Sequence, residues 1–68
     1  MNSKIFGETL MSLRKKKGMT QSELAERLSV SAKTISKWET GYGYPEITQL
    51  PALAKVFDVS IDFLSISA

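Results

Sequence analysis

The stretch that decides the fold is residues 20–41, TQSELAERLSVSAKTISKWETG. It opens on a capping box: the side chain of Thr20 can accept from the backbone amide three residues on, and Glu23 can reach back to the amide of Thr20. The apolar residues that follow recur at helical spacing. The pattern predicts a helix that begins after Thr20 and ends near Ser29.

A second helix follows after a short link. Ser31 is a typical N-cap, and Ile35 and Trp38 lie on one face of the helix that it would begin. Gly41 is suited to end this helix, because glycine readily adopts the left-handed conformation found at helix C-termini. The stretch therefore predicts two short helices within residues 21–40.

The spacing of small and apolar residues indicates how the two helices meet. Counted from Gln21, the small residue Ala25 stands fifth, where it lets the second helix approach closely. The apolar residues that hold the helices at a wide angle around one core are Leu24, Leu28, Val30, Ile35 and Trp38. This arrangement is the helix-turn-helix, whose second helix projects from the body and enters a DNA major groove.

The flanking sequence adds three more helices. Apolar residues recur at helical spacing over residues 4–17 and again over residues 49–57, where Thr48 is the expected cap. Ser60 is expected to cap a last short helix. Because no repeat, low-complexity segment or linker interrupts the pattern, the sequence predicts one all-α domain of five short helices over residues 1–68.

The composition excludes several classes of function. The chain has 68 residues, 43% of them hydrophobic, and contains neither Cys nor His. Without these two residue types there is no disulfide, thiol nucleophile, imidazole base or zinc site of the usual kind. The acidic residues form no paired cluster and no nucleotide motif is present, so we expect no metal, cofactor, small-molecule ligand or enzymatic activity. No apolar run is long enough to cross a membrane, and we expect a cytoplasmic protein.

The charges are unevenly placed, although the net charge is only +2. Up to Gly41, eight Lys and Arg residues stand against four Glu residues, whereas from Tyr42 onward one Lys stands against three acidic residues. This asymmetry favours an anion-binding face in the N-terminal part of the chain.

The outer face of the second central helix carries hydrogen-bonding side chains. When Ile35 and Trp38 point inward, the residues that point outward are Lys33, Ser36, Lys37 and Thr40, with Ala32 at the exposed tip. Lysine donates to guanine O6 and N7, serine and threonine donate to several base edges, and alanine contacts the thymine methyl group. The N-termini of both helices add backbone amides suited to phosphates.

Residues 20–41 closely resemble the helix-turn-helix of the lambda repressor/Cro-like family, also called the xenobiotic-response-element type. The resemblance extends to residues 13–18, LRKKKG, which look like the family's first helix, and to residues 45–60, which look like its fourth helix and the entry to its fifth. It implies a five-helix domain that binds a double-stranded DNA operator, usually a palindrome, as a homodimer.

The resemblance also implies roles for individual residues. Those expected to read base edges are Ala32, Lys33, Ser36 and Lys37. Those expected to bind DNA phosphates are Gln21, Ser31, Thr34, Thr40, Tyr42 and Tyr44. Arg14 and Glu39 match a family ion pair that ties the first helix to the end of the third. For the two tyrosines the alternative is that they only pack against the helix over residues 49–57.

One residue departs from the family pattern. Ser29 stands where members often have a glycine in a left-handed turn conformation. A serine in that conformation costs about 1 kcal/mol.

The C-terminal segment, residues 58–68, is rich in apolar side chains. The residues that could form a symmetric dimer patch are Ile61, Phe63, Leu64 and Ile66. Some of them must close the core, and the alternative is a plain core helix followed by a frayed tail. The chain could also be the N-terminal domain of a longer regulator.

Together these features predict a sequence-specific transcription regulator, a repressor of bacterial, phage or mobile-element type. The alternative is a protein-interaction module, similar to an antitoxin, that uses the helix-turn-helix fold and has only incidental affinity for DNA. Two outward-facing lysines, Lys33 and Lys37, favour the first hypothesis.

Overall fold

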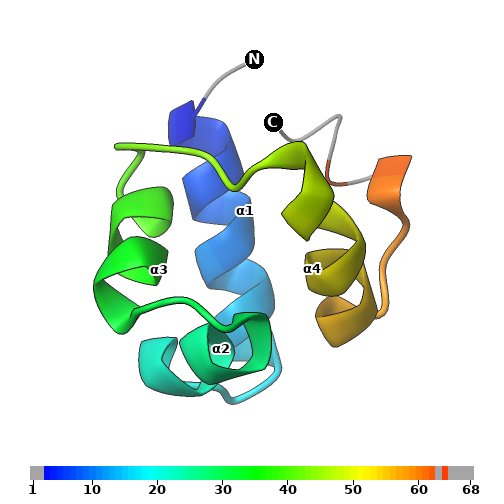
Figure 1. Cartoon of the computed structure of the whole chain (residues 1–68), viewed down its shortest axis with the longest axis horizontal. Helices are drawn as coiled ribbons and strands as arrows, with labels where there is room; N and C mark the ends of the chain where they lie inside the picture. The colour runs from blue at the N-terminus through cyan, green and yellow to red at the C-terminus, as the bar shows by residue number, and fades with distance from the viewer. Residues whose placement is uncertain (1–2, 63, 65–68) are drawn as a thin grey trace.

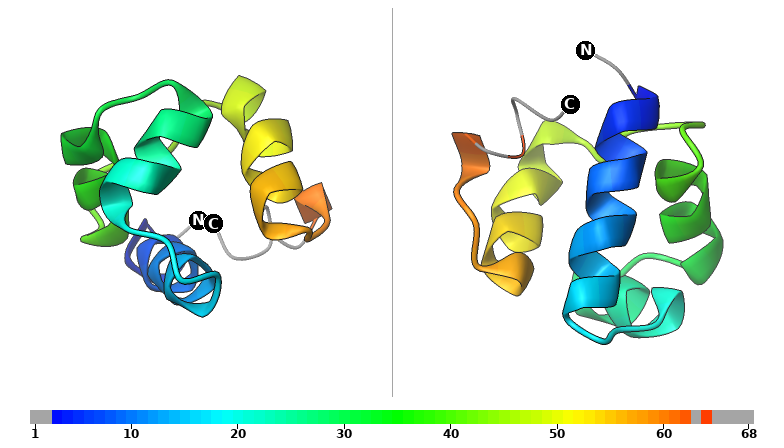
Figure 2. Two further views of the ribbon diagram at one scale, coloured as in Figure 1. Left: turned by 90° about the horizontal axis from the view of Figure 1, so that it is seen from below. Right: turned by 180° about the vertical axis from the view of Figure 1, so that it is seen from behind.

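The computed structural model describes residues 3–62 and 64, and its elements are all helical. They are α1 (Ser3–Lys16), α2 (Gln21–Leu28), α3 (Ala32–Glu39), the 3-10 turn η1 (Ile47–Gln49) and α4 (Leu50–Phe57), with no strand among the residues described. α1 runs between α3 and α4, and α2 crosses near one end of α1 (Figure 1). The view from behind in Figure 2 shows the same order. The predicted all-α class is confirmed.

The two central helices begin at the residues that the sequence predicts. The Thr20 hydroxyl accepts from the Glu23 amide at 3.0 Å, while the Thr20 amide donates to the Glu23 carboxylate at 2.8 Å. Ser31 accepts from the amide three residues on, at 3.1 Å. Both N-caps satisfy amides that have no partner inside their own helix, so α2 and α3 start at defined residues.

The turn between α2 and α3 depends on Ser29. This residue lies in the left-handed region, with φ 58° and ψ 40°, so serine takes the conformation that the resemblance assigns to glycine. The amides of Ser29 and Val30 donate to the carbonyls of Glu26 and Ala25 at 3.3 and 3.0 Å. These bonds close the end of α2 and turn the chain sharply into α3.

α1 approaches α3 closely at Gly7, a contact that no pattern in the sequence predicts. A Cβ atom at Gly7 would lie 2.3 Å from the carbonyl oxygen of Trp38 and 2.8 Å from that of Glu39. Only glycine fits there, because any side chain would overlap the backbone of α3. Gly7 therefore fixes how near the end of α3 sits to the body of the domain.

The start of α4 differs from the prediction. Thr48 is not its cap, since it lies inside η1, which runs directly into α4. The cap-like contact lies one turn earlier, where the Glu46 amide donates to Gln49 Oε1 at 2.8 Å. Pro51 lies in the first turn of α4, where its missing amide leaves no helical hydrogen bond unmade.

Of the five helices that the sequence predicts, the first four are α1 to α4, and helical backbone recurs at the place of the fifth. α4 ends at Asp58, which adopts the left-handed conformation with φ 54°. Beyond it, residues 61, 62 and 64 have a helical backbone, and the Leu64 amide donates to the Ser60 carbonyl at 3.4 Å. These described residues agree with the short helix predicted after Ser60. Phe63 lies outside the described residues.

One hydrophobic core joins all four helices. Its buried members are Phe6, Leu10, Leu24, Ala25, Ile35, Trp38, Leu53, Ala54, Phe57 and Leu64. Partly buried residues that the spacing placed on the inner faces, Leu28 and Val30 among them, pack around it. The core packs against one face of α3, and the opposite face of this helix is exposed to solvent.

Candidate nucleic-acid interface

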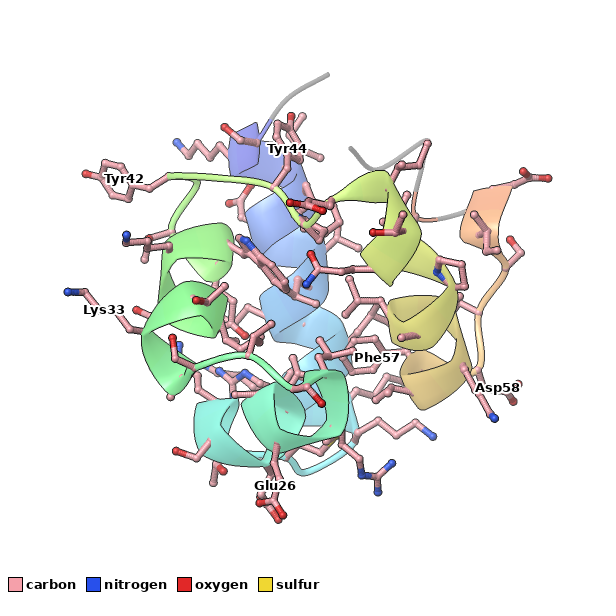
Figure 3. All side chains as sticks on the ribbon, viewed as in Figure 1. Glu26, Lys33, Tyr42, Tyr44, Phe57 and Asp58 are labelled. Atoms are coloured by element: carbon pink, nitrogen blue, oxygen red, sulfur yellow. The ribbon has the colours of Figure 1, made fainter. Side chains whose placement is uncertain are left out.

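α3 has a buried face and a solvent-facing one, as its spacing predicts. Ile35 is fully buried and Trp38 is 5% exposed. Of the four residues expected to read bases, Lys33 and Lys37 are exposed and Ser36 is half-buried, whereas Ala32, expected at an exposed tip, is half-buried and packs against the core. Figure 3 shows Lys33 projecting away from the body of the domain. The outer face of α3 thus presents two cations one helical turn apart and a hydroxyl.

The N-terminus of α3 carries a pair of hydroxyls. Ser31 Oγ and Thr34 Oγ1 lie 2.9 Å apart, and both groups are near the surface. This contact uses only one of the two hydroxyl protons, so the other can be donated to an external acceptor. The structure brings together two of the residues expected to bind phosphate.

Thr40, at the other end of α3, is differently placed. Its hydroxyl donates to the carbonyl of Ser36 at 2.8 Å and lies 3.3 Å from that of Lys37. The single proton of this hydroxyl is therefore directed into the helix, and a bond to a phosphate would require it to rotate away. Its phosphate contact stays a prediction.

The two tyrosines after α3 have different surroundings. Tyr42 is 84% exposed, and Figure 3 shows it pointing away from the body on the same side as Lys33. Its backbone is held, because its amide donates to the Lys37 carbonyl at 2.9 Å. Tyr44 is half-buried with its ring centroid 5.7 Å from that of Phe6 in α1. Tyr42 is available to an external partner, whereas the ring of Tyr44 packs inside the domain.

A buried ion pair joins α1 to the end of α3. Arg14 Nε lies 2.6 Å from Glu39 Oε2, and Arg14 Nη2 lies 3.0 Å from Glu39 Oε1. The arginine also donates to the Met19 carbonyl at 2.7 Å. The hydrogen bond to Glu39 raises the pKa of Arg14 above its ordinary value, so the guanidinium keeps its positive charge.

Gln21, the first residue of α2, belongs to the same cluster. Its Nε2 atom donates to Glu39 Oε1 at 3.1 Å, and the side chain is half-buried. The sequence predicts a phosphate contact for Gln21 and an ion pair for Glu39, but not the hydrogen bond between the two residues. Their positions at the edges of two inward faces are the only signal in the sequence for this contact.

The residues expected to form a dimer patch are divided by the structure. Leu64 is fully buried in the core of its own chain, so it is not available at the surface. Ile61 is 46% exposed. Phe63 and Ile66 lie outside the described residues.

No helix among residues 3–62 and 64 has the length and apolar character needed to cross a membrane. In the same part of the chain, no three metal-ligating side chains are grouped so that they could hold an ion.

The sequence matches a known protein family and is similar to two named regulators. Residues 10–64 match a family model described as helix-turn-helix. Over 59 residues, or 87% of the chain, the sequence is 51% identical to the HTH-type transcriptional activator BcrR of Enterococcus faecalis. Over 64 residues, or 94% of the chain, it is 36% identical to repressor protein C2 of Salmonella phage P22.

A solved structure has the same fold along nearly its whole length. The restriction-modification controller protein C.AhdI from Aeromonas hydrophila aligns with 91% of this chain and 90% of its own, at 26% identity and a TM-score of 0.81. The two relatives above are longer proteins, and the chain covers 29% and 30% of their lengths.

Proposed function

The chain belongs to the lambda repressor/Cro-like helix-turn-helix family, and from that premise we propose that it is a sequence-specific DNA-binding transcription regulator. The observation that carries the proposal is the division of α3 into two faces. Ile35 and Trp38 anchor the helix in the core, while Lys33 and Lys37 stand exposed on the other side. A helix presented in this way fits the DNA major groove.

The outer face of α3 has the chemistry for reading bases. The ammonium groups of Lys33 and Lys37 are donors for guanine O6 and N7. Ser36 can donate to or accept from several base edges, and the methyl group of Ala32 suits a thymine methyl. We assign base reading to these four residues.

Phosphate contacts would surround this face and set its orientation. The Ser31–Thr34 pair has a hydroxyl proton to donate, and the exposed Tyr42 hydroxyl lies just past the other end of α3. Gln21 stands at the start of α2, where the helix dipole favours an anion. Contacts of this kind position a protein on DNA without reading sequence.

The regulator would act as a dimer in the cytoplasm of a bacterial or phage-infected cell. Two copies of α3 placed about 34 Å apart would enter successive major grooves of a palindromic operator. Repression would follow when the operator overlaps a promoter. Because the relatives include both a named activator and a named repressor, the position of the operator is what would set the direction of regulation.

Selection of bound duplexes from a random DNA pool, repeated at two salt concentrations, tests the proposal. We expect an enriched inverted repeat whose half-sites lie about one helical turn apart. Weak binding that salt abolishes, with no enriched sequence, would leave only a basic surface and would favour the protein-interaction alternative.

The selected operator then tests the lysines. Lys33→Ala or Lys37→Ala should weaken operator binding by about 1–3 kcal/mol and affect random DNA less, because a lost base contact is lost only on the correct sequence. Lys55→Ala, which removes the same charge from α4, is the matched control and should leave operator preference unchanged. An equal loss on both DNAs would reassign the lysine to a phosphate.

A further inference from the structure

The Arg14–Glu39 pair does more than tie α1 to α3, because Glu39 also holds Gln21. The Glu39 carboxylate accepts three hydrogen bonds: two from Arg14, at 2.6 and 3.0 Å, and one from Gln21 Nε2, at 3.1 Å. Its side chain has no exposed surface, whereas that of Arg14 is 10% exposed. The Glu39 carboxylate is therefore bound by donors from two residues, Arg14 in α1 and Gln21 in α2.

The contact with Glu39 fixes the orientation of the Gln21 side-chain amide. A carboxylate only accepts hydrogen bonds, so the amide nitrogen, and not the amide oxygen, must face Glu39. That nitrogen carries a second N–H, and the bond to Glu39 uses only one of the two. A phosphate also only accepts, so it can bind Gln21 only through the remaining N–H.

We propose that Glu39 is a positioning residue for DNA binding, which orients the Gln21 carboxamide so that its second N–H is donated to a backbone phosphate. The inference rests on the proposed function and deepens it. Without Glu39, the amide of Gln21 can rotate and present its oxygen to the phosphate, which repels it. Glu39, at the end of α3, thereby also controls a phosphate contact at the start of α2.

Nuclear magnetic resonance on the full chain provides a test that needs no variant. On adding the selected operator, the side-chain amide protons of Gln21 should shift, and replacing one operator phosphate with a neutral methylphosphonate should remove that shift. If operator addition leaves both Gln21 side-chain protons unchanged, the proposal is wrong.

A double-mutant cycle tests the role of Glu39. Gln21→Ala should weaken operator binding about fivefold in the wild-type chain, as expected for one lost hydrogen bond. In the variant Arg14→Met/Glu39→Leu, which exchanges the pair for apolar side chains of similar size, Gln21→Ala should change binding by less than about twofold. Operator affinities are measured under conditions in which circular dichroism shows that each variant is folded.

Lys37→Ala is the control for both backgrounds, since it should cause the same loss in each. Equal losses from Gln21→Ala in the two backgrounds would show that Glu39 has a structural role only. If the lysine matters and Gln21 does not, the positioning proposal alone fails. If no operator is enriched and no variant changes DNA binding, the positioning proposal and the proposed function are both refuted. If the apolar pair variant does not fold, the resonance experiment decides.

Discussion

At the scale of single residues, glycine at position 7 has a structural effect out of proportion to its size. The space that a side chain would fill is occupied by two backbone carbonyl oxygens of α3, those of Trp38 and Glu39. Backbone atoms cannot rotate away as a flexible side chain can. Gly7 therefore sets the spacing between α1 and the helix that we assign to the major groove.

Gly7→Ala should destabilise the domain by about 3 kcal/mol, because α1 and α3 must separate and loosen the core. In a domain of this size that corresponds to a fall in Tm of at least about 10 °C, measured by thermal unfolding. Gly18→Ala is the matched control: Gly18 has φ +69° with no atom near its Cβ position, so it should cost only about 1 kcal/mol of left-handed strain. Equal losses at the two glycines would contradict the steric argument.

At the scale of elements, the helix-turn-helix is held by short-range contacts at the helix ends. Thr20 and Glu23 close the start of α2, Ser31 closes the start of α3, and Ser29 turns the chain between them. In the capping box, hydrogen bonds from Thr20 lower the pKa of Glu23 below its ordinary value of 4.5. The ionised carboxylate is thus the form that the folded helix prefers.

This preference predicts a pH dependence of stability. Because the pKa of Glu23 is lower in the folded state than in the unfolded one, its contribution is present above pH 4.5 and is lost as the pH falls through the lower folded value. Glu23→Gln keeps an acceptor for the Thr20 amide but does not titrate, so the difference in unfolding free energy from wild type should shrink as the pH is lowered.

Urea unfolding at pH 7 and at pH 3 measures this difference. Glu26→Gln, which removes an exposed carboxylate of the same helix outside the capping box, should leave the pH effect of Glu23 in place. If the unfolding free energies of the wild-type chain and the Glu23→Gln variant differ by the same amount at both pH values, the capping role of the Glu23 carboxylate is contradicted.

At the scale of the whole molecule, the buried cluster connects three helices that the loops alone would not hold. Arg14 lies in the last turn of α1, Gln21 begins α2 and Glu39 ends α3. α1, α2 and α3 also share the hydrophobic core, so the cluster adds a polar link to an apolar one. The position of α3 relative to the body depends on both.

Removing one partner of this pair should cost far more than removing both. Arg14→Met alone leaves the buried Glu39 carboxylate without its partner, and Glu39→Leu alone leaves the buried Arg14 guanidinium without its partner. Each variant should lower the unfolding free energy by about 3–5 kcal/mol. The double variant should lie within about 1 kcal/mol of wild type, since apolar side chains then fill the site. Urea unfolding of all four chains forms the cycle, and additive losses would exclude direct coupling.

Much of the candidate interface could be predicted from the sequence, because its signals are local. The N-caps at Thr20 and Ser31 depend on residues three positions apart, and the inward face of α3 follows from the spacing of Ile35 and Trp38. One local prediction was wrong, and one choice between surface and core was decided by the tertiary structure. Thr48 lies inside η1 and is not the cap of α4. Leu64 is one of the apolar residues of the last segment that close the core, which the sequence left undecided.

The sequence by itself determined the two central helices, their N-caps and the two faces of α3, since hydrogen bonds and side-chain periodicity act over a few residues of one chain segment. Only the tertiary structure decided how closely α1 meets α3 at Gly7 and that Gln21 shares a carboxylate with Arg14. The partners of Glu39 are 25 and 18 residues away along the chain. No local pattern encodes such distances, because they arise only when the whole core has packed and brought three helix ends to one point.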